Sequence, residues 1–83
     1  MKRDKNKEVL FVLVETEKGF LSSVMSALKE LPNIKDVNAV TGPFDIIVKI
    51  EVDSINEGLD IVLKQIREID GIKNTQTLVS VKV

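Results

Sequence analysis

The sequence predicts an α+β domain in which strands and helices follow the order β-α-β-β-α-β. Three observations predict it: two β-rich apolar runs, two segments with apolar residues at helical spacing, and an internal repeat. When the chain is shifted by 38 positions onto itself, apolar and charged residues coincide over most of its length. Leu28-Lys29-Glu30-Leu31, for example, falls on Ile66-Arg67-Glu68-Ile69. One strand-helix-strand unit therefore occurs twice.

The first unit begins with the β-rich run Val9 to Glu15, whose length is typical of a strand. A helix is expected next, and Pro32-Asn33 ends it because proline cannot continue a helix. Ile34 to Thr41 is the second expected strand. The apolar stripe of the helix consists of Phe20, Val24, Leu28 and Leu31.

The second unit begins with the run Asp45 to Val52. Ser54 and Glu57 form a capping box, in which each side chain satisfies a free backbone N–H at the helix start. Asp70-Gly71 supplies the helix stop, and Ile72 to Val83 is the last expected strand. The apolar stripe of this helix consists of Ile55, Leu59, Val62, Ile66 and Ile69.

The right-handed rule for β-α-β crossovers places both helices on one face of a four-stranded antiparallel sheet. This is the ferredoxin-like arrangement, in which the strands lie side by side in the order fourth, first, third, second. Alternation along the strands indicates which side chains meet the helices. The expected helix-facing set is Leu10, Val12 and Val14, beside Val48, Ile50 and Val52.

The other sheet face then carries Val9, Phe11 and Leu13 on its most central strand. A monomer would leave this apolar strip in water, so we expect a sheet-mediated homodimer, that is, a dimeric α+β barrel. The alternative is that the N-terminal segment folds over the strip. Residues 1–8 are expected to be flexible, and residues 9–83 to form the domain.

The composition excludes several classes of protein. Twelve Lys and Arg residues against 13 Asp and Glu give a net charge of −1, which argues against a strongly basic nucleic-acid binder. The chain has no Cys and no His, so disulfides, thiolate zinc sites and the usual catalytic bases are absent. We therefore expect no enzyme, no catalytic residues, no cofactor and no metal. With no secretory signal and no membrane span in the sequence, the expected location is the cytoplasm.

Two short motifs remain. Thr41-Gly42-Pro43-Phe44-Asp45 is a turn between two expected strands, and Asn74-Thr75-Gln76-Thr77 lies near the start of the last one. Taken alone, the first is a tight hairpin whose Asp bonds its own backbone, and the second is a polar strand start. The stretch Val9 to Val83 resembles the effector-binding (RAM) domain of the Lrp/AsnC, or feast/famine, transcription regulators. Gly42 and Asp45 match the family's G-x-x-D turn, Ile46 to Lys49 its next strand, and Thr75 with Thr77 its T-x-T.

The resemblance implies that a free amino acid or similar metabolite binds at clefts between dimers, often within octameric rings. Asp45 would accept from the ammonium group, while Gly42 and the turn backbone, with the Thr75 and Thr77 hydroxyls, would hold the carboxylate. Phe44 either packs against the ligand or serves in the core or interface.

Full-length members of the family carry a helix-turn-helix domain, whereas only Met1 to Glu8 precede the first strand here. We therefore expect a stand-alone regulatory domain, acting in transcription regulation without specific DNA binding of its own. One alternative is a ligand-free adaptor that forms mixed oligomers with a full-length Lrp-type regulator. The other is a small enzyme of the dimeric α+β barrel group.

Overall fold

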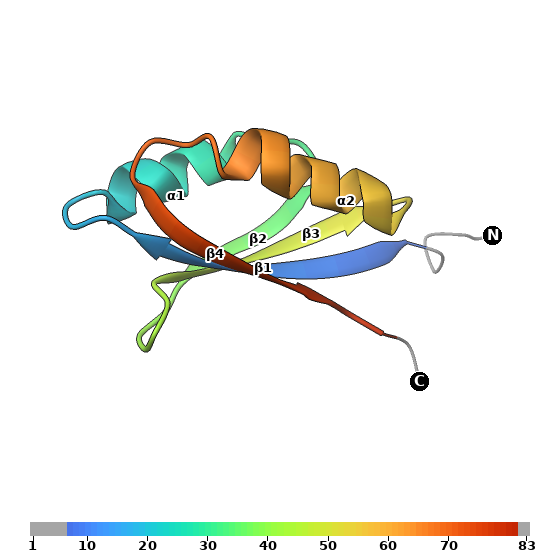
Figure 1. Ribbon diagram of the computed structural model, residues 1–83, viewed down its shortest axis with the longest axis horizontal. Helices are drawn as coiled ribbons and strands as arrows, with labels where there is room; N and C mark the ends of the chain where they lie inside the picture. Colours follow the sequence, from blue (N-terminus) through green and yellow to red (C-terminus); the bar gives the residue numbers. More distant parts are fainter. Residues whose placement is uncertain (1–6, 82–83) are drawn as a thin grey trace.

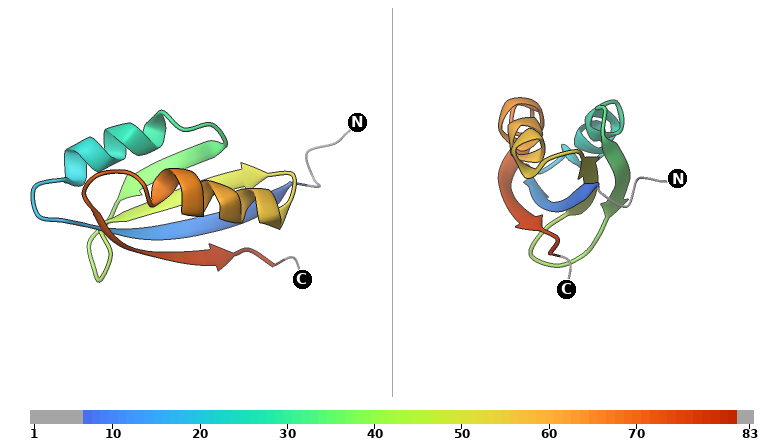
Figure 2. Two further views of the ribbon diagram at one scale, coloured as in Figure 1. Left: turned by 45° about the horizontal axis from the view of Figure 1, so that its top comes forward. Right: turned by 90° about the vertical axis from the view of Figure 1, so that its right-hand side faces the viewer.

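The computed structural model describes residues 7–81, and its elements follow the expected order (Figure 1). The four strands form one antiparallel sheet in the order β2-β3-β1-β4, with both helices on one face (Figure 2). This confirms the ferredoxin-like prediction. The elements are β1 (Glu8–Thr16), α1 (Leu21–Lys29), β2 (Ile34–Ala39), β3 (Ile46–Val52), α2 (Ile55–Ile61), its π-helical continuation η2 (Val62–Ile66) and β4 (Ile72–Val79).

The element ends differ from the expected ones by a few residues. β1 starts one residue earlier, at Glu8, and β2 ends at Ala39 rather than Thr41. Lys7, in the segment expected to be flexible, forms an ion pair with Asp53 at 2.8 Å between Nζ and Oδ1. β4 ends at Val79. Residues 1–6 of the expected flexible segment and 82–83 of the expected last strand lie outside the described residues.

The core lies between the helices and the two central strands, as the alternation predicts. The six side chains expected to face the helices are all fully buried: Leu10, Val12, Val14, Val48, Ile50 and Val52. The helices contribute Val24, Leu28, Ile61, Val62 and Ile66. The side chains between them along β1 are half-buried instead, because no helix covers that face.

The buried stripe of the second helix differs from the expected one. Leu59 was expected inside but is 37% exposed, whereas Gly58 and Ile61 are buried. Gly58 is the contact point with β1, since a Cβ added there would lie 2.5 Å from Leu10 Cδ1. Packing on this glycine turns the helix so that Leu59 lies beside the stripe rather than within it. Val62 and Ile66 stay buried, in the π-helical segment where the Arg67 N–H donates to the Val62 carbonyl.

The internal repeat is visible in the strand pairing. Val37 pairs with Val48 and, at the equivalent place, Thr75 pairs with Val14. The edge strands are thus related by 38 residues and the central strands by 34. The second helix, which is about one turn longer than α1, accounts for the difference. The offset of 38 is therefore wrong for β1 and β3, but both offsets are even, so the face predicted for each side chain is unaffected.

The loop after the second helix requires glycine at position 71. Gly71 has φ +96°, and a Cβ there would clash with the Phe20 ring. We expect Gly71→Ala to lower the free energy of unfolding by about 2 to 4 kcal/mol, from backbone strain plus overpacking. Gly19 is the matched control, because its φ is +87° but nothing lies near its added Cβ. Gly19→Ala should cost only about 1 kcal/mol in urea unfolding. Equal losses would contradict the Phe20 contact.

Candidate functional site

The expected turn connects β2 to β3 and projects on the sheet side away from the helices (Figure 1). The Val40 N–H donates to the Asp45 carbonyl at 2.8 Å, and the Asp45 N–H donates to the Val14 carbonyl at 2.9 Å. Gly42 has φ +133°, a conformation that side chains disfavour. The backbone bonds therefore fix the turn against the end of β1.

The Asp45 carboxylate binds β1 rather than its own backbone. Its Oδ2 accepts from the Thr16 N–H at 2.8 Å and from the Thr16 hydroxyl at 3.3 Å. The hairpin expectation for this side chain is thus wrong, because a partner 29 residues away takes its place. Among residues 7–81 no hydrogen bond involves Oδ1, and the side chain is half-buried. One carboxylate oxygen is available to a ligand.

A first hollow, of about 450 Å³, lies where the turn meets the uncovered sheet face. Leu13 and Ile47 pair across β1 and β3 and form its floor. Phe44 lines it, whereas Gly42 and Asp45 do not. Because its walls are almost wholly apolar, we call it the apolar hollow. Its lining residues are Leu13, Val40, Thr41, Pro43, Phe44 and Ile47.

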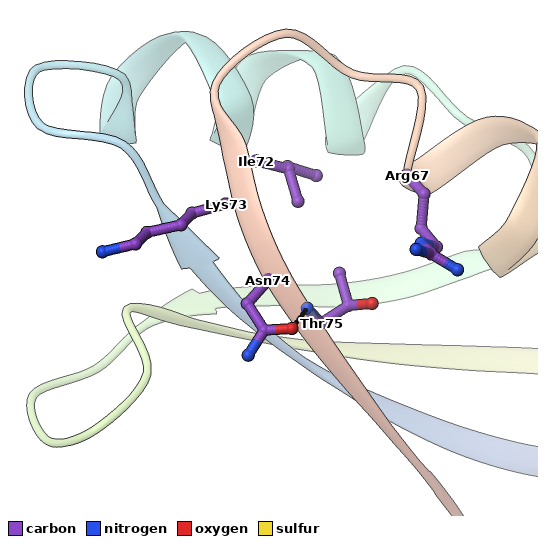
Figure 3. Close-up of a pocket in the computed structure, with 5 residues that line it drawn as sticks. All are labelled: Arg67, Ile72, Lys73, Asn74 and Thr75. Atoms are coloured by element: carbon purple, nitrogen blue, oxygen red, sulfur yellow. Dashed lines mark hydrogen bonds between the residues drawn. The ribbon is translucent and has the colours of Figure 1, made fainter.

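Thr75 and Thr77 belong to the other face of the sheet. They pair with Val14 and Val12, whose side chains face the helices, and both are half-buried on the edge strand β4. Thr75 also lines a second hollow of about 260 Å³, which is mostly polar and lies between the end of η2 and β4 (Figure 3). We call it the polar hollow. Its lining residues are Arg67, Ile72, Lys73, Asn74 and Thr75.

A single chain brings Asp45 and Thr75 to the same end of the sheet but not into contact. Val14 bonds the Asp45 N–H and pairs with Thr75, so β1 stands between them. Two strand spacings amount to about 10 Å. Neither of the two hollows is lined by both residues, so within one chain Asp45 and Thr75 do not share a pocket.

The uncovered face keeps an apolar strip along β1. Val9, Phe11 and Leu13 are half-buried, and Phe11 pairs with Leu78, whose side chain is 44% exposed. On the β3 side of the strip lies the Lys49–Glu51 ion pair, at 3.8 Å between nitrogen and oxygen.

The acidic side chains of and around β3 each have a separate partner. Glu51 pairs with Lys49, Asp53 with Lys7, and Asp45 binds Thr16. Within residues 7–81, no group of three or more metal-binding side chains gathers. No helix in that stretch is both long and apolar enough to cross a membrane.

The fold, the G-x-x-D turn and the T-x-T strand are together what is expected of a ligand-binding domain of the regulatory type. Residues 9–83 match the family described as the Lrp/AsnC ligand binding domain, so the chain belongs to that family. The HTH-type transcriptional regulator FL11 of Pyrococcus furiosus is 34% identical over 73 residues, which are 88% of this chain and 48% of FL11. The chain spans about half the length of the curated relatives it matches.

Solved structures agree on the fold. FFRP-DM1 superposes with a TM-score of 0.84 at 30% identity, over 89% of this chain and 99% of that one. The transcriptional regulator NMB0573 of Neisseria meningitidis, solved as a complex with L-Met, has a TM-score of 0.81 at 18% identity, over 90% of this chain and 50% of that one. The resemblance expected from the motifs is therefore confirmed at the level of family and fold.

Sequence reasoning did not single out Arg67, which lines the polar hollow. In the internal repeat Arg67 aligns with Lys29, and this position is typical of a solvated helix residue. The available signal was the strand that follows, where Asn74-Thr75 replaces Asp36-Val37 of the first unit.

Proposed function

We propose that this domain binds a free amino acid or similar small metabolite and regulates by changing its assembly. The observation that carries the proposal is the free Oδ1 of Asp45 at the same sheet end as the donor-rich polar hollow. A carboxylate suits an ammonium group, and hydroxyl and guanidinium donors suit a carboxylate. The ligand-binding description of the family and the L-Met complex of NMB0573 support it.

A second subunit completes the site in this proposal. β1 keeps Asp45 and Thr75 of one chain about two strand spacings apart, so the complementary group comes from a neighbour. Gly42 shapes the turn, Thr77 extends the row of hydroxyls along β4, and Phe44 contributes to the apolar hollow. Binding between subunits then favours whichever assembly holds the complete site.

The dimer forms through the uncovered sheet face. Association buries Val9, Phe11 and Leu13 and fills the apolar hollow with side chains of the partner. Such dimers then join into a larger ring, for which eight subunits is the proposed size. The proposed location is the cytoplasm, without a membrane or specific DNA as a partner.

An adaptor that forms mixed oligomers with a full-length Lrp-type regulator is the second candidate, because the same sheet face would serve a relative of equal fold. It differs from the first in having no ligand. A small enzyme of the dimeric α+β barrel group has less support, since both described hollows lack a nucleophile paired with a base.

Amino-acid binding predicts a rise in thermal stability. One of the twenty amino acids at millimolar concentration should raise the free energy of unfolding, by about 2.7 kcal/mol at a hundred times Kd. Asp45→Asn keeps an oxygen acceptor for Thr16 but loses the charge, so the shift should disappear. Glu51→Gln is the control: it removes a charge from β3 outside the turn, and the thermal shift should persist in this variant. Unchanged affinity in Asp45→Asn would reject the assigned site, and no shift with any amino acid would favour the adaptor.

The sheet-face dimer predicts the effect of a buried charge. Phe11→Lys places an ammonium group in the middle of the apolar strip, where a dimer would bury it without a partner. Sedimentation velocity at low micromolar concentration should show a dimer for the native chain and a monomer for the variant. Leu63→Lys is the control, because Leu63 is 54% exposed in the helix layer. A native chain that sediments as a monomer would reject the dimer.

A further inference from the structure

The polar hollow presents a cation that has no partner among the residues that the structure describes. Arg67 follows η2, and its side chain lies on the side of β4 to which the Thr75 hydroxyl points (Figure 3). In the stretch 7–81 that the structure describes, its guanidinium takes part in no ion pair or hydrogen bond. Its fork of N–H donors is therefore free to bind an anion from outside the chain.

The other polar groups around the hollow leave donors rather than acceptors. Lys73 is held by Glu15 at 3.7 Å and points to the opposite side of β4 (Figure 3). Asn74 Oδ1 accepts from the Thr75 N–H at 3.0 Å, which leaves the Asn74 amide nitrogen as a donor. The Arg67 guanidinium and the Thr75 hydroxyl lie on the same side of β4, whereas the Asn74 amide lies on the Lys73 side (Figure 3). A guanidinium and a hydroxyl without a carboxylate of their own form a pair of donors that suits an anionic ligand.

The internal repeat provides a comparison within one molecule. At the helix end and the edge strand the two units are related by 38 residues, so Arg67, Asn74 and Thr75 correspond to Lys29, Asp36 and Val37. The first unit builds the same helix-to-strand connection with an acidic and an apolar residue at the last two positions. The fold therefore does not require a donor set here, and the second unit has one for another reason.

We propose that the polar hollow is the subsite for the carboxylate of the effector, with Arg67 as its bidentate partner. The inference rests on the proposed function and deepens it. A planar carboxylate fits the guanidinium fork with two parallel hydrogen bonds, and the Thr75 hydroxyl supplies a third. Since β1 separates this hollow from Asp45 of the same chain, the ammonium of the bound molecule is held by Asp45 of a neighbouring subunit.

The test compares an amino acid with its amide, which lacks the carboxylate. Two amino acids serve as probes: L-methionine, and whichever amino acid gives the largest thermal shift. The amide of each is measured beside it. Arg67→Gln should lower the affinity for the amino acid about 10- to 100-fold, as expected for the loss of charged hydrogen bonds. The affinity for the amide should be unchanged. Arg67→Lys should restore only part of the affinity. Lys29→Gln, at the equivalent exposed position of the first unit, should change neither ligand.

A second readout does not depend on affinity. The chain has only two arginines, Arg3 and Arg67, so the Nε–H resonances in an NMR spectrum are few, and Arg67→Gln assigns them. The Arg67 resonance should move with the amino acid and stay in place with the amide. Acetate and inorganic phosphate are the probes for a general anion site.

The outcomes separate the two proposals. Binding that Asp45→Asn abolishes but Arg67→Gln preserves, with an unmoved Arg67 resonance, overturns this inference and leaves the proposed function standing. Acetate or phosphate binding as tightly as the amino acid overturns the assignment to an effector carboxylate. If no amino acid binds the native chain, the proposed function fails and the subsite fails with it.

Discussion

The apolar side chains on both faces of β1 constrain the rest of the structure. One face carries Leu10, Val12 and Val14, fully buried under the helices, and the other carries the strip that includes Phe11. β1 pairs with β3 and β4, so it is central and its backbone bonds are satisfied on both sides. A single layer of two helices covers only one face, and burial of the second requires another layer. The strand that forms the core therefore also drives the proposed association.

The same strand divides the proposed ligand site. Val14 bonds the turn that carries Asp45 and pairs with Thr75, which fixes both groups at one end of the sheet and keeps them apart. In the proposed function, each half holds only one end of an α-amino acid. Assembly and ligand binding are consequently one problem in this account, and a ligand bound between subunits stabilises the contact that creates its site. The duplicated unit uses the same helix-to-strand connection in two ways. It is purely structural at Asp36-Val37, and it carries polar side chains at Asn74-Thr75.

The fold could be predicted because alternation and repetition are local signals. Neighbouring residues are enough to predict the buried faces of β1 and β3, the capping box at Ser54 and the turn at Gly42. The capping box is present in the structure, where the Glu57 N–H donates to Ser54 Oγ at 3.2 Å. The rotation of the second helix could not be predicted, since it depends on how closely Gly58 approaches Leu10. The partner of Asp45 could not be predicted either, because Thr16 lies 29 residues away in the sequence. Arg67 belongs to no motif, and its surroundings emerge only when β4 packs beside the helix end.

Subunit mixing tests most directly whether the site is shared between chains. Asp45→Asn and Arg67→Gln chains would be co-expressed with different tags, mixed oligomers isolated, and amino-acid binding measured by calorimetry against each variant alone. Random association of two kinds of subunit should restore about a quarter of the sites, because some pairs combine an intact Asp45 from one chain with an intact Arg67 from another. Mixed oligomers that bind no better than either variant would show that both groups act within one chain, which would contradict the account.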